Sequence, residues 1–221
     1  MAHDILAVDF GDPDPSAIRT AARTLESDGV ALFPCDTVYT VGTLPDEVEH
    51  VPAGVERLFS FKRRGGGPSF PWLVASPDML DTFGADVSDE ARRLVEAFWP
   101  GGLSVVVRAS RLVPRALAHP DGTISLRMSA SPVVAALLAE LGRPMVSTGA
   151  NVHGTLSPLA FGDVAPEIVE AVDVALDAGE HVCRGRATII DCSRGPARIM
   201  RAGVVSPEEI DEALGYRMPV V

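Results

Sequence analysis

Short apolar runs and amphipathic stretches follow one another along most of the chain. The apolar runs predict buried strands, and apolar residues spaced three to four positions apart predict helices that pack against them. Strands are expected at residues 30–33, 72–75, 103–107, 123–128, 145–146, 174–176 and 189–190. Helices are expected after Asp14, before Lys62, and after Ser76, Ser88, Ser131 and Ser206. Because strands and helices interleave with short connections, the pattern predicts an α/β layered domain.

Capping residues define several of the expected helix ends. Asp14 precedes Pro15, an acidic cap followed by proline at the first helical position, and Gly29 is expected to end that helix. A capping box begins at Ser206, so a short C-terminal helix is expected over about residues 206–215. Residues 43–54 are expected to form a loop with at most a short helix. The glycines at 65–67 fit a mobile lid, a backbone close to a ligand, or a plain flexible loop.

The composition limits the classes of protein that fit. The chain has 221 residues, of which 47% are hydrophobic, so it can bury a substantial core within a single domain over residues 1–221. Its formal net charge of −11 opposes a surface built to hold nucleic acid, so a polyanion site must be a local cluster of Lys and Arg. The three cysteines have no Cys-x-x-Cys spacing, and we find no secretion signal and no apolar run of membrane-spanning length. A cytoplasmic location and no membrane partner are therefore expected.

The stretch over residues 29–42 carries a dense group of candidate site residues. An apolar run ends at Pro34, which has no N–H to give to a sheet, and Cys35, Asp36, Thr37 and Tyr39 follow. Polar residues just beyond a buried strand are where open α/β sheets keep their ligand sites. Taken alone, the stretch fits a polar turn at a strand end better than a ligand site.

Further short motifs follow in order along the chain. They are Lys62-Arg63-Arg64, Phe-Trp-Pro-Gly-Gly-Leu-Ser at 98–104, Ser125-Leu126-Arg127, Ser-Thr-Gly-Ala-Asn at 147–151 and Arg201-Ala202-Gly203. Together with Pro-Cys-Asp-Thr-Val-Tyr-Thr-Val at 34–41, they resemble the motifs of the YrdC-like family, the threonylcarbamoyl-AMP synthases. The resemblance covers about residues 29–203, within a motif-bearing core of about 14–203.

The resemblance implies both a fold and a reaction. The implied fold is a twisted mixed sheet, flanked by helices, around a deep positive cleft. In the implied reaction, the amine of threonine takes up bicarbonate, and the resulting carbamate attacks the α-phosphorus of ATP and expels pyrophosphate. This is the first step in forming threonylcarbamoyladenosine in tRNA, and a separate transferase complex uses the product. Mg²⁺ could be carried by the phosphates, because no acidic pair stands at metal-ligand spacing.

The family motifs also imply roles for individual residues. Four cations at motif positions stand out in an acidic chain, and arginine forks suit phosphate. Lys62, Arg64 and Thr37 are expected to be catalytic. The expected nucleotide-binding residues are Lys62, Arg64, Arg127, Ser147, Thr148, Asn151 and Arg201. The expected substrate-binding residues are Thr37, Tyr39, Phe70, Gly149 and Thr188.

Several family positions are changed in this chain. Cys35 and Thr40 replace a threonine and a glycine, and the Lys-x-Arg motif is followed by Gly65 instead of proline. Phe70, Gly149, His153 and Ala187 stand where the family has polar or hydroxyl-bearing residues. Because the losses fall near the acceptor and the cations are kept, threonine is expected to be used poorly or replaced by another amine. Main-chain groups and the longer loop at 65–67 could instead restore the lost contacts.

Two further classes of function remain open at this stage. One is a cysteine hydrolase that uses Cys35 with His153 or His181, although a buried inert thiol is the more common case. The other is a non-catalytic module that binds a nucleotide or RNA. The net charge of −11 opposes RNA and predicts no tight direct binding of tRNA.

Overall fold

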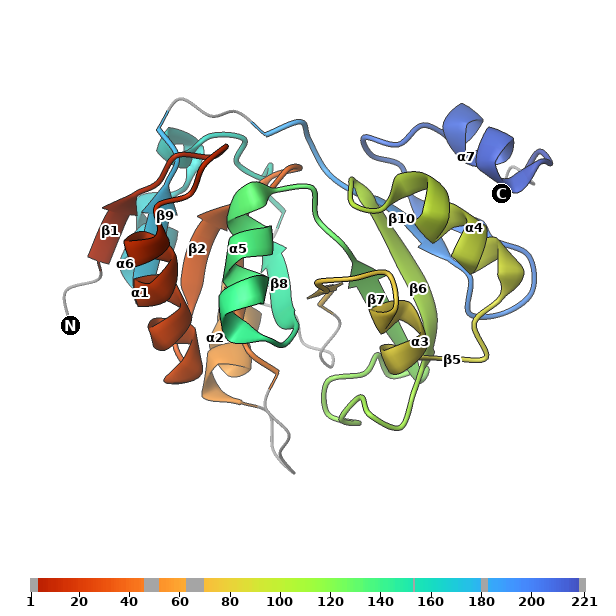
Figure 1. Ribbon diagram of the computed structural model, residues 1–221, viewed down its shortest axis with the longest axis horizontal. Helices are drawn as coiled ribbons and strands as arrows, with labels where there is room; N and C mark the ends of the chain where they lie inside the picture. Colours follow the sequence, from red (N-terminus) through yellow and green to blue (C-terminus); the bar gives the residue numbers. More distant parts are fainter. Residues whose placement is uncertain (1–3, 46–51, 63–69, 153, 180–182, 219–221) are drawn as a thin grey trace.

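A mixed β-sheet is the centre of the computed structural model, which describes residues 4–45, 52–62, 70–152, 154–179 and 183–218 (Figure 1). At Phe61 and Lys62 only the backbone is described. The strands are β1 Asp4–Ala7, β2 Ala31–Pro34, β3 Tyr39–Thr43, β4 Trp72–Leu73, β5 Gly84–Ala85, β6 Leu103–Ala109, β7 Thr123–Arg127, β8 Met145–Gly149, β9 Val174–Asp177, β10 Thr188–Asp191 and β11 Arg198–Arg201. The helices are α1 Pro15–Glu26, α2 Ala53–Lys62, α3 Met79–Phe83, α4 Asp89–Phe98, α5 Pro132–Leu141, α6 Pro166–Ala171 and α7 Pro207–Leu214, with a 3₁₀ turn at Phe161–Asp163.

All of the described strands belong to this one sheet. Ten run in the order β1-β9-β2-β3-β8-β4-β7-β6-β10-β11, and β5 pairs with β6 outside that path. The sheet contains both parallel pairs, such as β1–β9 and β4–β7, and antiparallel pairs, such as β2–β3 and β6–β7. The α/β class and the mixed, helix-flanked sheet predicted from the sequence are confirmed.

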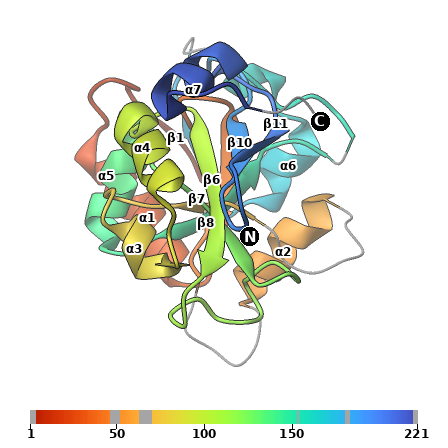
Figure 2. The same cartoon turned by 90° about the vertical axis from the view of Figure 1, so that its right-hand side faces the viewer.

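Helices cover the two faces of the sheet with two separate apolar cores. On one face, Ile18 of α1 and Leu137 of α5 pack with Phe33 of β2. The second core contains residues of helices α2, α4, α6 and α7 together with strand residues such as Leu32 and Leu126. Figure 2 looks along the sheet, with α1 and α5 on one side of it and α2 and α6 on the other.

Most helix starts lie where the capping residues predict them. The side chain of Asp14 accepts backbone N–H groups from Ser16 and Ala17, and Ser206 forms the expected capping box with Glu209. The prediction for Ser76 was wrong, because α3 begins after Asp78. Helix α1 also ends earlier than expected, at Glu26.

The chain after α1 explains what Gly29 does. Asp28 takes the left-handed conformation, with φ of 60°. A Cβ at Gly29 would lie 2.5 Å from the carbonyl oxygen of Thr24, so this glycine is required by close approach of the backbone. The glycine therefore follows the turn that ends α1 and does not itself make it.

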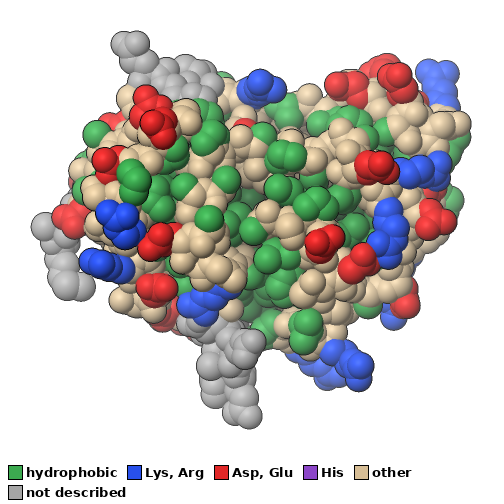
Figure 3. All heavy atoms as spheres, viewed as in Figure 1, with side chains coloured by type: hydrophobic (Ala, Val, Ile, Leu, Met, Phe, Trp, Pro, Cys, Tyr) green, Lys and Arg blue, Asp and Glu red, His purple; other side chains and the backbone are tan. Residues whose placement is uncertain are grey.

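The surface seen from the direction of Figure 1 carries mixed charges. Lys and Arg side chains are interspersed with Asp and Glu, and a strip of hydrophobic side chains lies between the two halves of the molecule (Figure 3). Among the described residues, no helix is long and apolar enough to cross a membrane.

Candidate active site

A cavity of about 230 Å³ opens on the sheet face that α1 and α5 cover only in part. Strand register determines which side chains reach it. Ser125 of β7 pairs with Val106 of β6, and Arg127 pairs with Leu73 of β4, so these four side chains share one face. All four line the cavity, whereas the alternate residues, such as Leu126, belong to the opposite core.

Arg127 is the most firmly held cation of the cavity. It is only 6% exposed, and its guanidinium donates to the Gly101 carbonyl (Nε, 2.9 Å), the Thr37 hydroxyl (Nη1, 2.7 Å) and the Asp36 carboxylate. A guanidinium has five N–H donors, so two remain without an assigned partner among the described residues. The arginine is thus oriented in advance and can still donate to a ligand.

Asp36 keeps this arginine in place. Burial would raise the pKa of Asp36, but the Arg127 guanidinium and the Ser129 hydroxyl outweigh that effect and hold the pKa below its usual value. The carboxylate is therefore ionised at neutral pH. Because Asp36 follows β2 and Arg127 ends β7, the pair also ties two strands of the sheet together.

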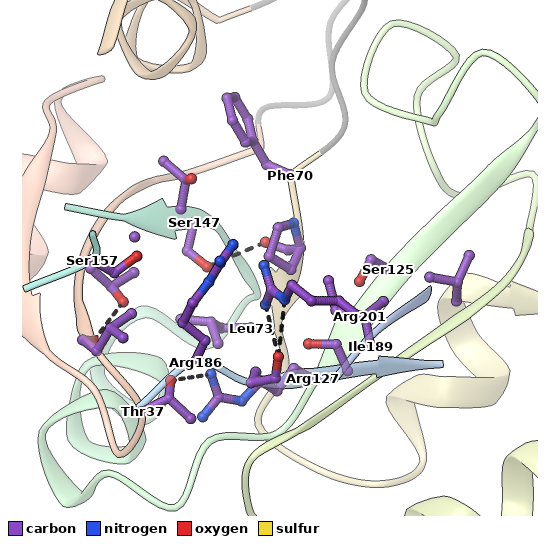
Figure 4. A pocket seen from close by; sticks show the side chains of 18 of the residues that line it. Thr37, Phe70, Leu73, Ser125, Arg127, Ser147, Ser157, Arg186, Ile189 and Arg201 are labelled. Carbon is purple, nitrogen blue, oxygen red and sulfur yellow. Dashed lines mark hydrogen bonds between the residues drawn. The ribbon is translucent and has the colours of Figure 1, made fainter. Parts of the chain in front are cut away.

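Two further arginines reach the same cavity. Arg201 donates from Nε and Nη2 to the Ala187 carbonyl, at 3.1 and 2.9 Å. The exposed Arg186 makes no side-chain hydrogen bond or ion pair with any other described residue. Figure 4 shows Arg127, Arg186 and Arg201 gathered in one part of the cavity. No carboxylate lines it among the described residues, so its chemistry favours an anionic ligand.

Hydroxyl groups line the side of the cavity formed by β3 and β8. Thr37, Ser147 and Thr148 are all at its wall, and Ser147 donates to the Pro71 carbonyl at 3.3 Å. Phe70 also lines the wall and stacks on Phe59, with ring centroids 4.8 Å apart. The predicted residues Thr37, Phe70, Arg127, Ser147, Thr148, Gly149 and Arg201 are thus brought together.

Polar side-chain atoms lie close to the position that a side chain at Gly149 would take. A Cβ at this position would lie 3.0 Å from the hydroxyl oxygen of Ser157 and 3.1 Å from Oδ1 of Asn151. Ser157 also lines the cavity. The space beside Gly149 is therefore already occupied by a serine hydroxyl that comes from eight positions later in the chain.

Tyr39, Thr188 and Asn151 are not among the described residues that line the cavity, and their binding roles remain predictions. Tyr39 is fully buried, and its hydroxyl accepts the Ala178 N–H at 3.0 Å. Thr188 is also buried, and its hydroxyl donates to the Val205 carbonyl at 2.7 Å. Asn151 accepts a hydrogen bond from Ser157 at 3.2 Å, so it holds the loop that carries that serine. All three make hydrogen bonds within the protein around the site.

The first cationic motif cannot be placed from the structure. The side chain of Lys62 and all of Arg64, the glycines at 65–67 and His153 lie outside the described residues. Their expected roles remain predictions.

Some cavity residues were not expected from the sequence. Ser104, His119, Ser125, Ser157 and Arg186 all line it. Ser125 lies between the buried apolar residues Ile124 and Leu126, and that period of two could have identified it. Ser104 is followed by three valines, so its strand shows no such alternation. Arg186, His119 and Ser157 lie in loops without such a pattern, so only the tertiary structure reveals them.

Cys35 does not have the surroundings of a nucleophile. Its thiol is buried, lies 3.1 Å from the Ser129 hydroxyl and is not part of the cavity wall. Burial raises the pKa of the Cys35 thiol, which keeps it protonated at neutral pH. The geometry therefore gives no support to the cysteine hydrolase.

The described part of the chain contains no group of three or more His, Cys, Asp and Glu side chains arranged to hold a metal ion.

Comparison with known proteins gives consistent matches. Residues 23–203 match the Sua5/YciO/YrdC family model, which is described as "Telomere recombination". A putative threonylcarbamoyl-AMP synthase of Mycobacterium leprae is 36% identical over 209 residues, or 94% of this chain and 93% of that protein.

Solved structures agree with the sequence matches. The structure of Pyrococcus abyssi Sua5 complexed with L-threonine superposes with a TM-score of 0.86 at 29% identity, over 96% of this chain. The chain spans only 61% of the length of that Sua5. Escherichia coli YciO has a TM-score of 0.85 over 95% of this chain and all of its own, but at 23% identity it supports the fold alone.

Proposed function

Because the chain belongs to the Sua5/YciO/YrdC family, we propose that it is a threonylcarbamoyl-AMP synthase. It joins threonine, bicarbonate and ATP and releases pyrophosphate. The observation that carries the proposal is the cavity lined by Arg127, Arg186 and Arg201, which has no carboxylate among its described residues. Two of these arginines lie on motif positions, and hydroxyls line the wall beside them.

The reaction brings two anions together, and the arginines of this cavity would offset the repulsion between them. The amine of threonine takes up bicarbonate to form a carbamate. A carboxylate oxygen of the carbamate then attacks the α-phosphorus of ATP, and the bond to the pyrophosphate oxygen breaks. Arg127, already fixed by Asp36 and Thr37, can neutralise developing charge without first reorganising. Alignment of the two reactants accounts for much of the remaining barrier.

Threonine is the acceptor that we favour. The serine lost at position 149 has a counterpart in Ser157, whose hydroxyl oxygen lies 3.0 Å from where the Cβ would be. Thr37 lines the same wall and accepts from Arg127. The Sua5 structure with bound L-threonine supports the same choice. A different amine remains the alternative, since Phe70 and Ala187 bring apolar surface to the wall.

Mg²⁺ would enter with the triphosphate, held by phosphate oxygens. The product is a reactive mixed anhydride, so a separate transferase complex would consume it when tRNA is modified. We propose no tight direct contact between this chain and tRNA.

Release of pyrophosphate from ATP tests the proposal. The assay is run with Mg²⁺ and bicarbonate and with a panel of amino acids and simple amines. We expect release that requires both bicarbonate and threonine. Binding of ATP without release under any condition would indicate a non-catalytic nucleotide-binding module. A larger specificity constant for another amine would assign the acceptor differently while keeping the reaction class.

A further inference from the structure

Two polar atoms in the cavity wall have no hydrogen-bond partner among the described residues. They are the hydroxyl oxygen of Ser125 and Nε2 of His119, and both are buried. Ser125 is only 4% exposed, and both residues line the cavity. Native proteins rarely leave buried polar atoms unpaired, so these two atoms point to a ligand that supplies the missing partners.

The hydrogen-bond network fixes the tautomer of His119. The hydroxyl of Thr123 donates its single proton to Oδ1 of Asp121, at 2.7 Å. His119 Nδ1 lies 3.2 Å from the same hydroxyl oxygen, which can then only accept. Nδ1 therefore carries a proton. Burial lowers the pKa of His119, with Asp121 opposing weakly, so the ring is neutral at pH 7. Nε2 is then an acceptor that requires a donor from the ligand.

Ser125 precedes Arg127 by two residues in strand β7, so the two side chains lie on the same face of the strand. Residues spaced in this way are about 7 Å apart. In Figure 4, Arg201 lies between Ser125 on one side and Thr37 and Ser157 on the other. Val106, paired with Ser125, adds an apolar wall beside it. The cavity thus has hydroxyls at one end, cations in the middle, and an uncharged, partly apolar end with unpaired polar atoms.

We propose that His119 and Ser125 bind the base of the nucleotide and select adenine over guanine. The proposal rests on the proposed function only in that a nucleotide enters this cavity. Adenine carries an exocyclic amine, a donor for His119 Nε2, beside a ring nitrogen that can accept from the Ser125 hydroxyl. Guanine and hypoxanthine carry a carbonyl oxygen where adenine has the amine. That oxygen would face the lone pair of Nε2, so both groups would remain unpaired.

Binding of nucleotides measured by calorimetry tests this without requiring turnover. The probes are ATP, GTP, ITP and the triphosphate of purine riboside, which lacks the exocyclic amine. We expect the protein to bind ATP at least about tenfold more tightly than each of the other three. Equal affinity for ATP and GTP in the unmodified protein would overturn the proposal.

Two variants assign the effect to residues. His119→Phe should bind ATP and the purine riboside triphosphate equally, because the acceptor for the amine is gone. Ser125→Ala should weaken ATP and reduce its advantage over GTP. Ser110→Ala removes a hydroxyl that donates to the Thr82 carbonyl outside the cavity, and it should leave the ratio of ATP to GTP affinity unchanged. Variants that keep the full preference of the unmodified protein would refute the assignment.

Inorganic tripolyphosphate separates loss of base recognition from misfolding. It occupies the arginines alone, so its affinity should be the same in the unmodified protein and in His119→Phe and Ser125→Ala. If a variant also loses tripolyphosphate binding, its melting curve shows whether it is folded. If His119→Phe is unfolded, the base preference of Ser125→Ala, which is the smaller change, tests the proposal. Preferential binding of ATP without pyrophosphate release would support this inference and refute the proposed function. Equal pyrophosphate release from ATP and GTP would support the proposed function and refute this inference.

Discussion

At the scale of single residues, Arg127 is the cation whose removal has the clearest consequence. Arg127→Ala should weaken ATP binding, because each charge-assisted hydrogen bond to phosphate contributes about 1.5–3 kcal/mol. Arg127→Lys should recover only part of this, since a lysine keeps the charge and loses the fork. Calorimetry of ATP binding measures both variants.

The matched control for Arg127 is Arg92. Arg92 forms a paired contact with Asp81 on the outer surface, at 2.6 and 2.7 Å, and does not line the cavity. Arg92→Ala should leave ATP affinity unchanged. An unchanged affinity in Arg127→Ala would remove this arginine from the nucleotide site.

Gly149 and Ser157 form a second pair whose coupling can be measured. Ser157→Ala should raise the KM for threonine, and Gly149→Ser alone should crowd the hydroxyl 3.0 Å away. In the double variant the new serine has room, so its specificity constant for threonine should exceed that of either single variant. Steady-state kinetics of the four proteins complete the cycle. Strictly additive effects would show that the two positions do not share one space.

At the scale of elements, the contact between Asp36 and Arg127 ties the end of β2 to the end of β7. Asp36→Ala leaves a buried guanidinium without its counter-ion and should lower the free energy of unfolding at pH 7 by about 3–5 kcal/mol. Denaturant unfolding measures this. Asp81→Ala breaks the exposed pair with Arg92 and should cost no more than about 1 kcal/mol.

The same contact predicts how stability depends on pH. The pKa of Asp36 in the folded protein lies below the usual 3.8, so the folded state favours the ionised form. The stabilisation is complete above pH 3.8 and is lost as the pH falls through the lower, folded-state pKa. Asp36→Asn should therefore show a flatter loss of stability than the unmodified protein over this acid range. Parallel acid profiles of the two would contradict this assignment.

Elements with strong local patterns could be predicted from the sequence, and the others could not. Strand β6 contains three consecutive valines at 105–107, and α5 has both its caps, Ser131 and Gly142, in the sequence. By contrast, β1 and β11 are short and partly exposed, and β3 places Thr40 and Gly42 in a fully buried strand. Their pairing depends on neighbours far along the chain, which a local pattern does not contain.

The residues of the candidate site also differ in whether the sequence could predict them. Arg127 and Ser147 could be predicted because they lie in or beside strands that carry recognisable motifs. Tyr39 and Thr188 lie in the same motifs but face the core, since motif membership does not reveal on which side of the sheet a residue lies. His119 and Arg186 lie in loops, and the fold alone brings them to the cavity.

At the scale of the whole molecule, charge predicts how the protein meets tRNA. The net charge of −11 and the mixed charges on the face shown in Figure 3 provide no continuous basic surface on the described part of that face. Phosphate-backbone affinity depends on the number of Lys and Arg contacts. No complex should appear in a gel shift at physiological salt with submicromolar protein. ATP binding in the same buffer shows that the protein sample is able to bind its ligand. A retarded tRNA band would refute the prediction.

The placement of Ser157 beside Gly149 has a consequence for how members of such a family are recognised. A functional group can stay at one point in space while the codon that specifies it moves eight positions along the chain. Comparison column by column would score this as a missing serine at one position and an unrelated serine at another. Classifying enzymes as active or degenerate from aligned positions would then discard a chain whose cavity still presents the hydroxyl.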